Sequence, residues 1–150
     1  MVTVRELNPG EVAYVDSRLP LSRLDQQVEQ ESSYLIAWED DQPVGHAHLA
    51  WEGTHLGVPE VQDVYVLPEC RSRGIATLLN HAAEEAVRAR GCESISLSVS
   101  KDGNPSARRL YDRLGYVDAG VDPVHVSGAI MLRGRPFEVD DTLIYLRKAL

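Results

Sequence analysis

Apolar and polar residues alternate in several short runs of the chain, and this spacing predicts β-strands. The runs with this pattern are Val2–Leu7, Ser33–Trp38, Val44–Trp51, Val58–Leu67, Ile95–Ser100, Val124–Leu132 and Thr142–Lys148. The turn residues of 40–43 separate the second run from the third, which predicts a hairpin. Residues 11–31 show a mixed pattern, and we expect part of them to be helical, with a break at Pro20.

The pattern changes to a helical period after Gly74. Apolar residues then recur at helical spacing as Ile75, Leu78, Leu79, Ala82, Ala83, Ala86 and Val87. Gly91 is a natural stop for this helix, and Glu84 and Arg88 are spaced for an ion pair along it. A second helix is predicted over Ser106–Leu114, after a proline at a position where its missing N–H costs little.

The order of these elements predicts the fold class. Strands come first, a strand–helix–strand–helix segment follows, and strands return at the end. This order predicts a mixed α/β sheet with helices packed against it. The length suits a single domain over residues 1–150, and no linker or internal repeat divides the sequence.

Charge, apolar runs and cysteines exclude several classes of function. The net charge is −8, whereas a nucleic-acid binder usually carries a basic patch, so we expect no nucleic-acid partner. No apolar run approaches the roughly 20 residues of a membrane span, and the N-terminus does not resemble a signal peptide. Cys70 and Cys92 lack the spacing of metal ligands or of a disulfide framework. We therefore expect free thiols, no metal site and a cytoplasmic location.

The stretch Val64–Ala76 carries the most informative chemical pattern. A predicted strand ends in a turn rich in Arg and Gly, and a helix begins at once. A helix N-terminus binds anions, because its N–H groups are unpaired and carry a partial positive charge. Arg71 and Arg73 add positive charge, and Gly74 allows a ligand close to the backbone. We therefore predict a pyrophosphate site, although the Walker and dinucleotide-binding glycine patterns are both absent from the sequence.

At this stretch the chain resembles the GNAT superfamily of N-acetyltransferases. The family pattern Q/R-x-x-G-x-G/A is met by Arg71–Ala76, after a strand of the form hydrophobic-x-Val-x-Pro-Glu at Val64–Glu69. A second family pattern, N-x-x-A-x-x-x-Y-x-x-x-G-F/Y, is met in full by Asn104–Tyr116. The resemblance implies a mostly antiparallel sheet of six to seven strands, with a V-shaped splay between strands 4 and 5, flanked by about four helices.

The resemblance also implies acetyl-CoA as the cosubstrate. The backbone N–H groups from Ser72 to Thr77 are expected to hold its pyrophosphate, and the strand edge at Val64–Val66 and the side chain of Asn104 its pantetheine arm. Tyr111 is expected to protonate the leaving thiolate; the alternative is a packing role on its helix. The residues implied to bind the cosubstrate are Val64, Tyr65, Val66, Arg71, Ser72, Arg73, Gly74, Ile75, Ala76, Thr77, Asn104 and Tyr111.

Acetyl transfer also needs a base for the amine proton and a donor for the developing oxyanion. Glu60 is our first choice of base and Asp63 the second. Strand alternation places them on opposite faces, so only one faces the cleft unless a bulge intervenes. Both can instead be ordinary surface carboxylates, and many relatives use no obvious base. The N–H of Val66 is the expected oxyanion donor, and His46 and His48 are expected to be half-exposed rather than metal ligands.

The predicted function is direct transfer of an acetyl group from acetyl-CoA to a primary amine. The alternatives are a catalytically silent acyl-CoA-binding domain of the same fold and a module that docks a basic partner on an acidic face. The acceptor stays open among polyamines, amino acids, aminoglycosides and protein N-termini. The acidic composition favours a small cationic amine. The C-terminal residues Val124–Leu150 are a candidate contact of a homodimer through an exposed strand edge.

Overall fold

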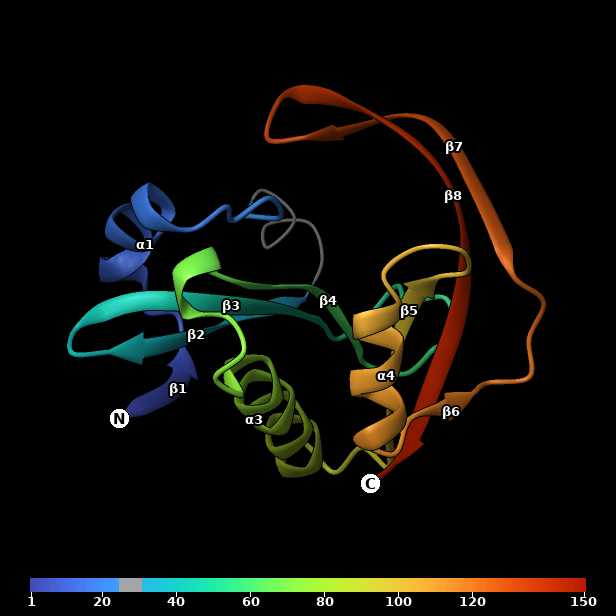
Figure 1. The fold of residues 1–150 in the computed structure, drawn as a ribbon, viewed down its shortest axis with the longest axis horizontal. Helices are drawn as coiled ribbons and strands as arrows, with labels where there is room; N and C mark the ends of the chain where they lie inside the picture. The colour runs from blue at the N-terminus through green and yellow to red at the C-terminus, as the bar shows by residue number, and fades with distance from the viewer. Residues whose placement is uncertain (25–30) are drawn as a thin grey trace.

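A computed structural model describes residues 1–24 and 31–150 of the chain. Within these residues it shows one eight-stranded sheet, with the order β1-β2-β3-β4-β5-β8-β6 and with β7 paired to β8 (Figure 1). The strands are β1 (Val2–Glu6), β2 (Ser32–Glu39), β3 (Gln42–Ala50), β4 (Glu60–Val66), β5 (Ser94–Ser100), β6 (Val117–Asp118), β7 (Val124–Leu132) and β8 (Arg135–Ala149). The described helices are α1 (Val12–Arg18), α3 (Ile75–Ala89) and α4 (Pro105–Arg113), with 3-10 turns at Pro9–Glu11 and Pro68–Cys70.

The two faces of the sheet bury different hydrophobic clusters, because neighbouring residues of a strand point to opposite faces. Leu35 and Ala37 of β2 pack in the cluster that contains residues of α3 and α4. Tyr34, Ile36 and Trp38 pack in a second cluster with α1 and the segment after it. The sheet therefore has an α3/α4 face and an α1 face.

The pairing between β4 and β5 is short, and it is the parallel contact in an otherwise antiparallel sheet. The parallel register covers Glu60 with Ser96 and Val61 with Leu97. The other described strand pairs are antiparallel. A mostly antiparallel sheet that opens between its fourth and fifth strands confirms the predicted fold class.

The C-terminal hairpin extends past the edge of β5. Its strands pair from Val124 with Leu143 to Leu132 with Arg135, and Figure 1 shows the hairpin arching toward α1. Arg133 at its tip makes a two-pronged ion pair with Asp16 of α1, which ties the hairpin to the opposite side of the molecule. β8 begins seven residues before the predicted Thr142, because its N-terminal part pairs with β7.

Several details differ from the sequence prediction. The short β6 and the full hairpin bring the strands to eight, above the predicted six to seven, and the described part has three α-helices where about four were predicted. The predicted Glu84–Arg88 pair is wrong, because Arg88 bonds to Glu85 and Glu84 is buried against Lys148. None of the described helices has the length and apolarity required to cross a membrane.

Candidate active site

A bulge in β4 shapes the place where β4 leaves β5. Gln62 pairs with His48 and Tyr65 pairs with His46, so β4 advances three residues while β3 advances two. Asp63 lies in this bulge with a φ of 53°, a left-handed conformation that Asp adopts more readily than most residues. The extra residue breaks the simple alternation, and Glu60 and Asp63 consequently line the same cavity.

This cavity, of about 420 Å³, lies between β4 and β5 and is also lined by α4 and β8. Its volume falls within the usual range of small-molecule sites. The cavity brings together five of the residues that were predicted for the site: Glu60, Asp63, Val64, Asn104 and Tyr111.

Tyr111 reaches the cavity from the α3/α4 face, where its side chain belongs to the main hydrophobic cluster. The residue is 9% exposed, and its ring meets that of Tyr116 edge-on at 5.7 Å between centroids. Burial raises the pKa of the Tyr111 hydroxyl, so it is protonated at neutral pH. Among the described residues this hydroxyl has no hydrogen-bond partner, which leaves its proton available to a bound molecule.

Glu60 reaches the cavity from the α1 face, since its neighbour Val61 points into the cluster on the other side. Glu60 is 7% exposed, and its Oε2 accepts a hydrogen bond from Gln62 Nε2 at 2.6 Å. Gln62 Oε1 lies 3.0 Å from His48 Nδ1. An ionised carboxylate only accepts hydrogen bonds, so the Gln62 amide nitrogen faces Glu60 and the Gln62 oxygen accepts from His48 Nδ1–H. This chain of hydrogen bonds fixes the orientation of the Glu60 carboxylate.

His46 and His48 are buried, which corrects the prediction that they are half-exposed. Each is 1% exposed, and both rings contact Tyr34, at 5.5 and 4.8 Å between centroids. Burial lowers the pKa of His46 to about 4 and also lowers that of His48, so both are neutral. His46 Nε2 donates to the carbonyl of Pro20 at 3.1 Å. The segment after α1 covers this face, and strand periodicity alone could not show that cover.

The carboxylates of Asp63 and Glu60 differ in their bonding partners. Asp63 is paired with the guanidinium of Arg23, which follows α1 in the chain. Glu60 has a neutral amide as its hydrogen-bond donor within the described residues. A proton taken up by Asp63 would weaken an ion pair, whereas one taken up by Glu60 would not. Glu60 is therefore the better placed of the two carboxylates to accept a proton.

The predicted phosphate loop lies where α3 begins. Gly74 precedes the helix with a φ of 79°, and Ser72 has a φ of 63°. The N–H of Leu78 donates to the carbonyl of Gly74 at 3.1 Å, so the N–H groups of residues 75–77 come before the first helical bond. These groups have the arrangement that binds anions at helix N-termini.

Protein groups hold both arginines of this loop. Arg71 Nε donates to the carbonyl of Val66 at 2.9 Å, and its guanidinium lies 5.6 Å from the ring centroid of Tyr65. Arg73 binds both carboxylate oxygens of Glu39 at the end of β2, which lowers the pKa of that carboxyl. Tyr65 packs with the cluster on the α1 face and does not line the cavity.

Val66 presents its backbone to the opening between β4 and β5. The N–H of Leu67 donates to the carbonyl of Val44 at 2.9 Å, and Val66 is the next residue back, opposite Gly45. Backbone groups of neighbouring residues in a strand point to opposite sides, so those of Val66 point away from β3. The bond from Arg71 to the Val66 carbonyl agrees with this direction. The N–H of Val66 thus faces the side on which an oxyanion donor was predicted.

Comparison with known proteins places these features in a family. A model of the family described as the acetyltransferase (GNAT) family matches residues 3–116. This chain belongs to the GNAT acetyltransferase family. The match includes every residue of both sequence patterns that carried the resemblance. It ends at Tyr116, where the second pattern ends.

Solved structures with the GNAT fold superimpose on the whole chain. A GNAT acetyltransferase from Elizabethkingia anophelis with acetyl-CoA bound has a TM-score of 0.73 at 15% identity, and the match covers 99% of this chain and 98% of that one. An IAA acetyltransferase from Bacillus cereus has a TM-score of 0.70 at 16% identity, covering 100% of both chains. Mutant forms of a spermidine/spermine N-acetyltransferase from Vibrio cholerae give 0.69 at 20% identity, covering 99% and 95%.

The cavity of this GNAT protein is also lined by residues that were not predicted for the site, among them Arg23, Gln62 and Tyr145. Gln62 lies two residues from Glu60 on the same strand face, so strand alternation could have predicted its place beside Glu60. Arg23 lies in a stretch without periodicity, so no signal marked it. Tyr145 lies on β8, and burial together with the negative charge of Glu60 raises the pKa of its hydroxyl.

Proposed function

We propose that this GNAT protein transfers the acetyl group of acetyl-CoA directly to the primary amine of a small molecule. The observation that carries the proposal is that Tyr111 and Glu60 line one cavity from opposite faces of the sheet. The neighbour solved with acetyl-CoA and the neighbour named for spermidine and spermine support a cosubstrate and an acceptor of these kinds.

The residues of this chain fit acetyl-CoA. The N–H groups of residues 72–77 suit a pyrophosphate, and no atom lies within 4 Å of the place where Gly74 would carry a Cβ. Asn104 Oδ1 accepts from the N–H of Ala107 at 3.2 Å, so the side-chain NH₂ is the group that Asn104 offers to a pantetheine arm. When bound, acetyl-CoA supplies the acetyl group as a thioester with a thiolate as leaving group.

Three groups of the chain then have separate roles in the reaction. Glu60 takes the proton of the attacking amine, directly or through a water, with Asp63 as the second candidate. The N–H of Val66 donates to the carbonyl oxygen as negative charge develops on it. Tyr111 gives its proton to the departing sulfur. Tyr111 and Glu60 approach the cavity from opposite faces of the sheet, which suits separate roles for the acid and the base.

A catalytically silent acyl-CoA-binding domain would need only the helix N-terminus and the opening between the strands. The buried Glu60, held by Gln62 and placed across the cavity from a protonated Tyr111, favours the enzyme. Nothing in cofactor binding alone calls for a carboxylate that is ordered in this way.

The test is thiol release from acetyl-CoA in the presence of polyamines, monoamines, amino acids, aminoglycosides and a peptide with a free N-terminus. The proposal predicts amine-dependent release and a product heavier by one acetyl group in mass spectrometry. Binding of acetyl-CoA without amine-dependent release from any of these compounds would contradict the proposal and favour the silent domain.

A further inference from the structure

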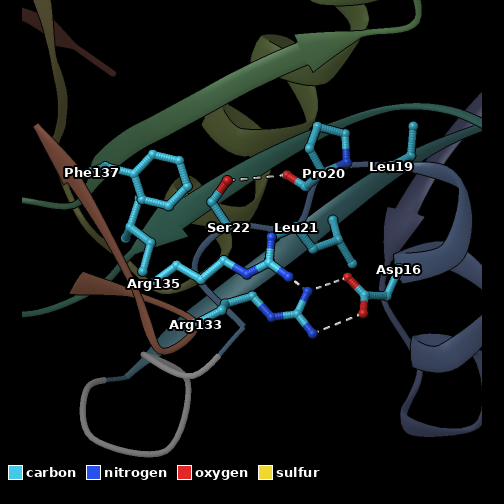
Figure 2. A pocket seen from close by; sticks show the side chains of 9 residues that line it. Asp16, Leu19, Pro20, Leu21, Ser22, Arg133, Arg135 and Phe137 are labelled. Carbon is cyan, nitrogen blue, oxygen red and sulfur yellow. Dashed lines mark hydrogen bonds and ion pairs between the residues drawn. The ribbon is translucent and has the colours of Figure 1, made fainter. Parts of the chain in front are cut away.

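A second cavity, of about 470 Å³, lies on the α1 side of the molecule. One wall comes from α1 and the segment after it, and the other comes from the β7–β8 hairpin (Figure 2). Both walls carry charged and apolar side chains.

The described residues that line this cavity include an arginine without a charged partner among them. Arg133 and Asp16 neutralise each other in their two-pronged ion pair. Arg135 also lines the cavity, and among the described residues it has no ion-pair partner. Among the described residues that line the cavity, two arginines face one aspartate, in a protein whose net charge is −8.

The rest of the lining is largely apolar. The buried Leu19 and Leu21 and the half-buried Leu132 form the aliphatic part of the lining. Phe137 adds an aromatic ring that remains 49% exposed on the hairpin. Figure 2 shows the side chains of Phe137, Arg133 and Arg135 extending from the hairpin, across from the segment that carries Ser22. Apolar side chains together with a few charged or polar groups are the usual composition of a small-molecule site.

One short stretch of backbone connects this cavity to the candidate active site. Ser22 lines the second cavity, and the next residue, Arg23, lines the first and binds Asp63 there. The two cavities therefore lie on either side of the same segment. A ligand that extends past this segment would have one end beside acidic groups and the other beside Arg135.

We propose that the second cavity binds the far end of the acceptor, and that the acceptor is a small amine carrying both a carboxylate and an apolar group. The ammonium end is attracted to Glu60 and Asp63, the carboxylate to Arg135, and the apolar group to Phe137 and the neighbouring leucines. The proposal rests on the proposed function, because it needs the amine in the first cavity. It departs from the cationic acceptor suggested by overall charge, because Arg135 repels a second ammonium group.

The experiment compares acceptors that differ only in the carboxylate. L-phenylalanine is paired with phenethylamine, and the dipeptide alanyl-phenylalanine with its decarboxylated phenethylamide, so two spacings between amine and carboxylate are covered. We expect kcat/KM for the carboxylated member of at least one pair to exceed that of its partner about ten-fold or more, as charged hydrogen bonds usually give. Equal or better use of the decarboxylated members, or of spermidine, would overturn the proposal.

Variants of Arg135 provide the second readout. Arg135→Gln should raise KM about ten-fold for the carboxylated acceptor, with little change in kcat. The KM of the decarboxylated acceptor should stay unchanged. Arg135→Lys keeps the positive charge and should raise KM for the carboxylated acceptor less than Arg135→Gln does. The matched control is Arg88→Gln, which removes an arginine paired with Glu85 on the surface of α3. An unchanged KM in Arg135→Gln would contradict the proposal.

Binding measurements separate this inference from the proposed function. The protein is titrated calorimetrically with acetyl-CoA, and the CoA-saturated protein is then titrated with N-acetyl-L-phenylalanine, N-acetyl-alanyl-phenylalanine and their decarboxylated counterparts. Absence of acetyl-CoA binding would remove both proposals. Acetyl-CoA binding together with acetylation of amines regardless of a carboxylate would remove this inference alone. So would a failure of the CoA-saturated protein to bind either carboxylated product.

Discussion

Gln62 donates a hydrogen bond from Nε2 to Oε2 of Glu60 at 2.6 Å, inside the cavity where β4 leaves β5. His48 extends the chain by donating from Nδ1 to the Gln62 oxygen at 3.0 Å. The three side chains lie on one face of the sheet, away from the α3/α4 face from which Tyr111 enters. The position of the proposed base thus depends on a residue, His48, that does not line the cavity.

Replacing Glu60 tests the base directly. Glu60→Gln should lower kcat about a hundred-fold with the Kd for acetyl-CoA unchanged, because a proton acceptor is lost while the shape is kept. Asp63→Asn should have a smaller effect, since Asp63 is already engaged by Arg23. Steady-state kinetics with one amine at fixed pH measure both. A greater loss in Asp63→Asn would reverse the two roles.

Replacing Gln62 tests positioning. Gln62→Met keeps the length of the side chain but removes the donor to Glu60, and we expect kcat to fall about ten-fold with little change in KM. Gln42→Met, at an exposed position at the start of β3, is the matched control. A kcat equal to wild type in Gln62→Met would show that the Glu60 carboxylate needs no support from this amide.

The neighbouring rings of Tyr111 and Tyr116 allow a paired prediction for the acid. Tyr111→Phe should lower turnover about ten- to a thousand-fold and leave acetyl-CoA binding nearly intact. Tyr116 bonds instead to Glu84 and Asn80, so Tyr116→Phe should cost about 1–2 kcal/mol of unfolding free energy with kcat per folded molecule unchanged. Unchanged turnover in Tyr111→Phe at every pH would exclude Tyr111 from the mechanism.

Much of the fold could be read from the sequence, because local patterns determine it. The helical period after Gly74 and the proline before Ser106 placed α3 and α4 to within about two residues, as capping and periodicity usually allow. The strand pairs between Ser33 and Trp51 followed in the same way from alternation.

The arrangement around Glu60 could not be read in this way, because it depends on contacts between distant segments. The bulge at Asp63 leaves a small mark in the residue pattern, two consecutive polar residues between Val61 and Val64, and this does not show which side chains then meet in the cavity. His46 and His48 are buried because Tyr34 and the segment at Pro20 cover them. Alternation gives the face on which a residue lies, but not what covers that face.

Two adjacent glutamates of α3 should respond very differently to substitution. Glu84 is 2% exposed and binds Lys148, Tyr116 and Asn80, whereas Glu85 pairs with Arg88 on the surface. Glu84→Ala leaves Lys148 half-buried without its partner and should lower the unfolding free energy by about 3 kcal/mol. Glu85→Ala should change it by less than about 0.5 kcal/mol. Chemical denaturation measures both, and equal effects would contradict the importance of the buried network.

His46 should make stability depend on pH. Its pKa is about 4 in the folded protein against 6.5 for the ordinary side chain, because burial disfavours the charged form. Between these values the unfolded chain binds more protons, so this stability is complete above pH 6.5 and is lost as the pH falls toward 4. The difference corresponds to about 3 kcal/mol. His48, whose pKa burial also lowers, adds to the loss in the same direction.

Denaturation curves of His46→Phe across this range check the prediction. The variant should show a weaker decline in unfolding free energy from neutral to acidic pH than the wild type. His125→Phe, at an exposed position on the hairpin, should keep the wild-type decline. An identical pH dependence in His46→Phe and wild type would mean that His46 does not titrate as its burial requires.

The central claim, that the opening between β4 and β5 and the start of α3 form an acetyl-CoA site, is tested most directly by calorimetric titration with acetyl-CoA. ATP serves as the comparison ligand, and Gly74→Glu is measured beside wild type. Gly91→Glu is the matched control, because Gly91 has the same φ of 79° and equal free space at the other end of α3. We predict micromolar binding by wild type and Gly91→Glu, much weaker binding of ATP, and no binding by Gly74→Glu. No binding by wild type, or equal binding by Gly74→Glu, would contradict the claim.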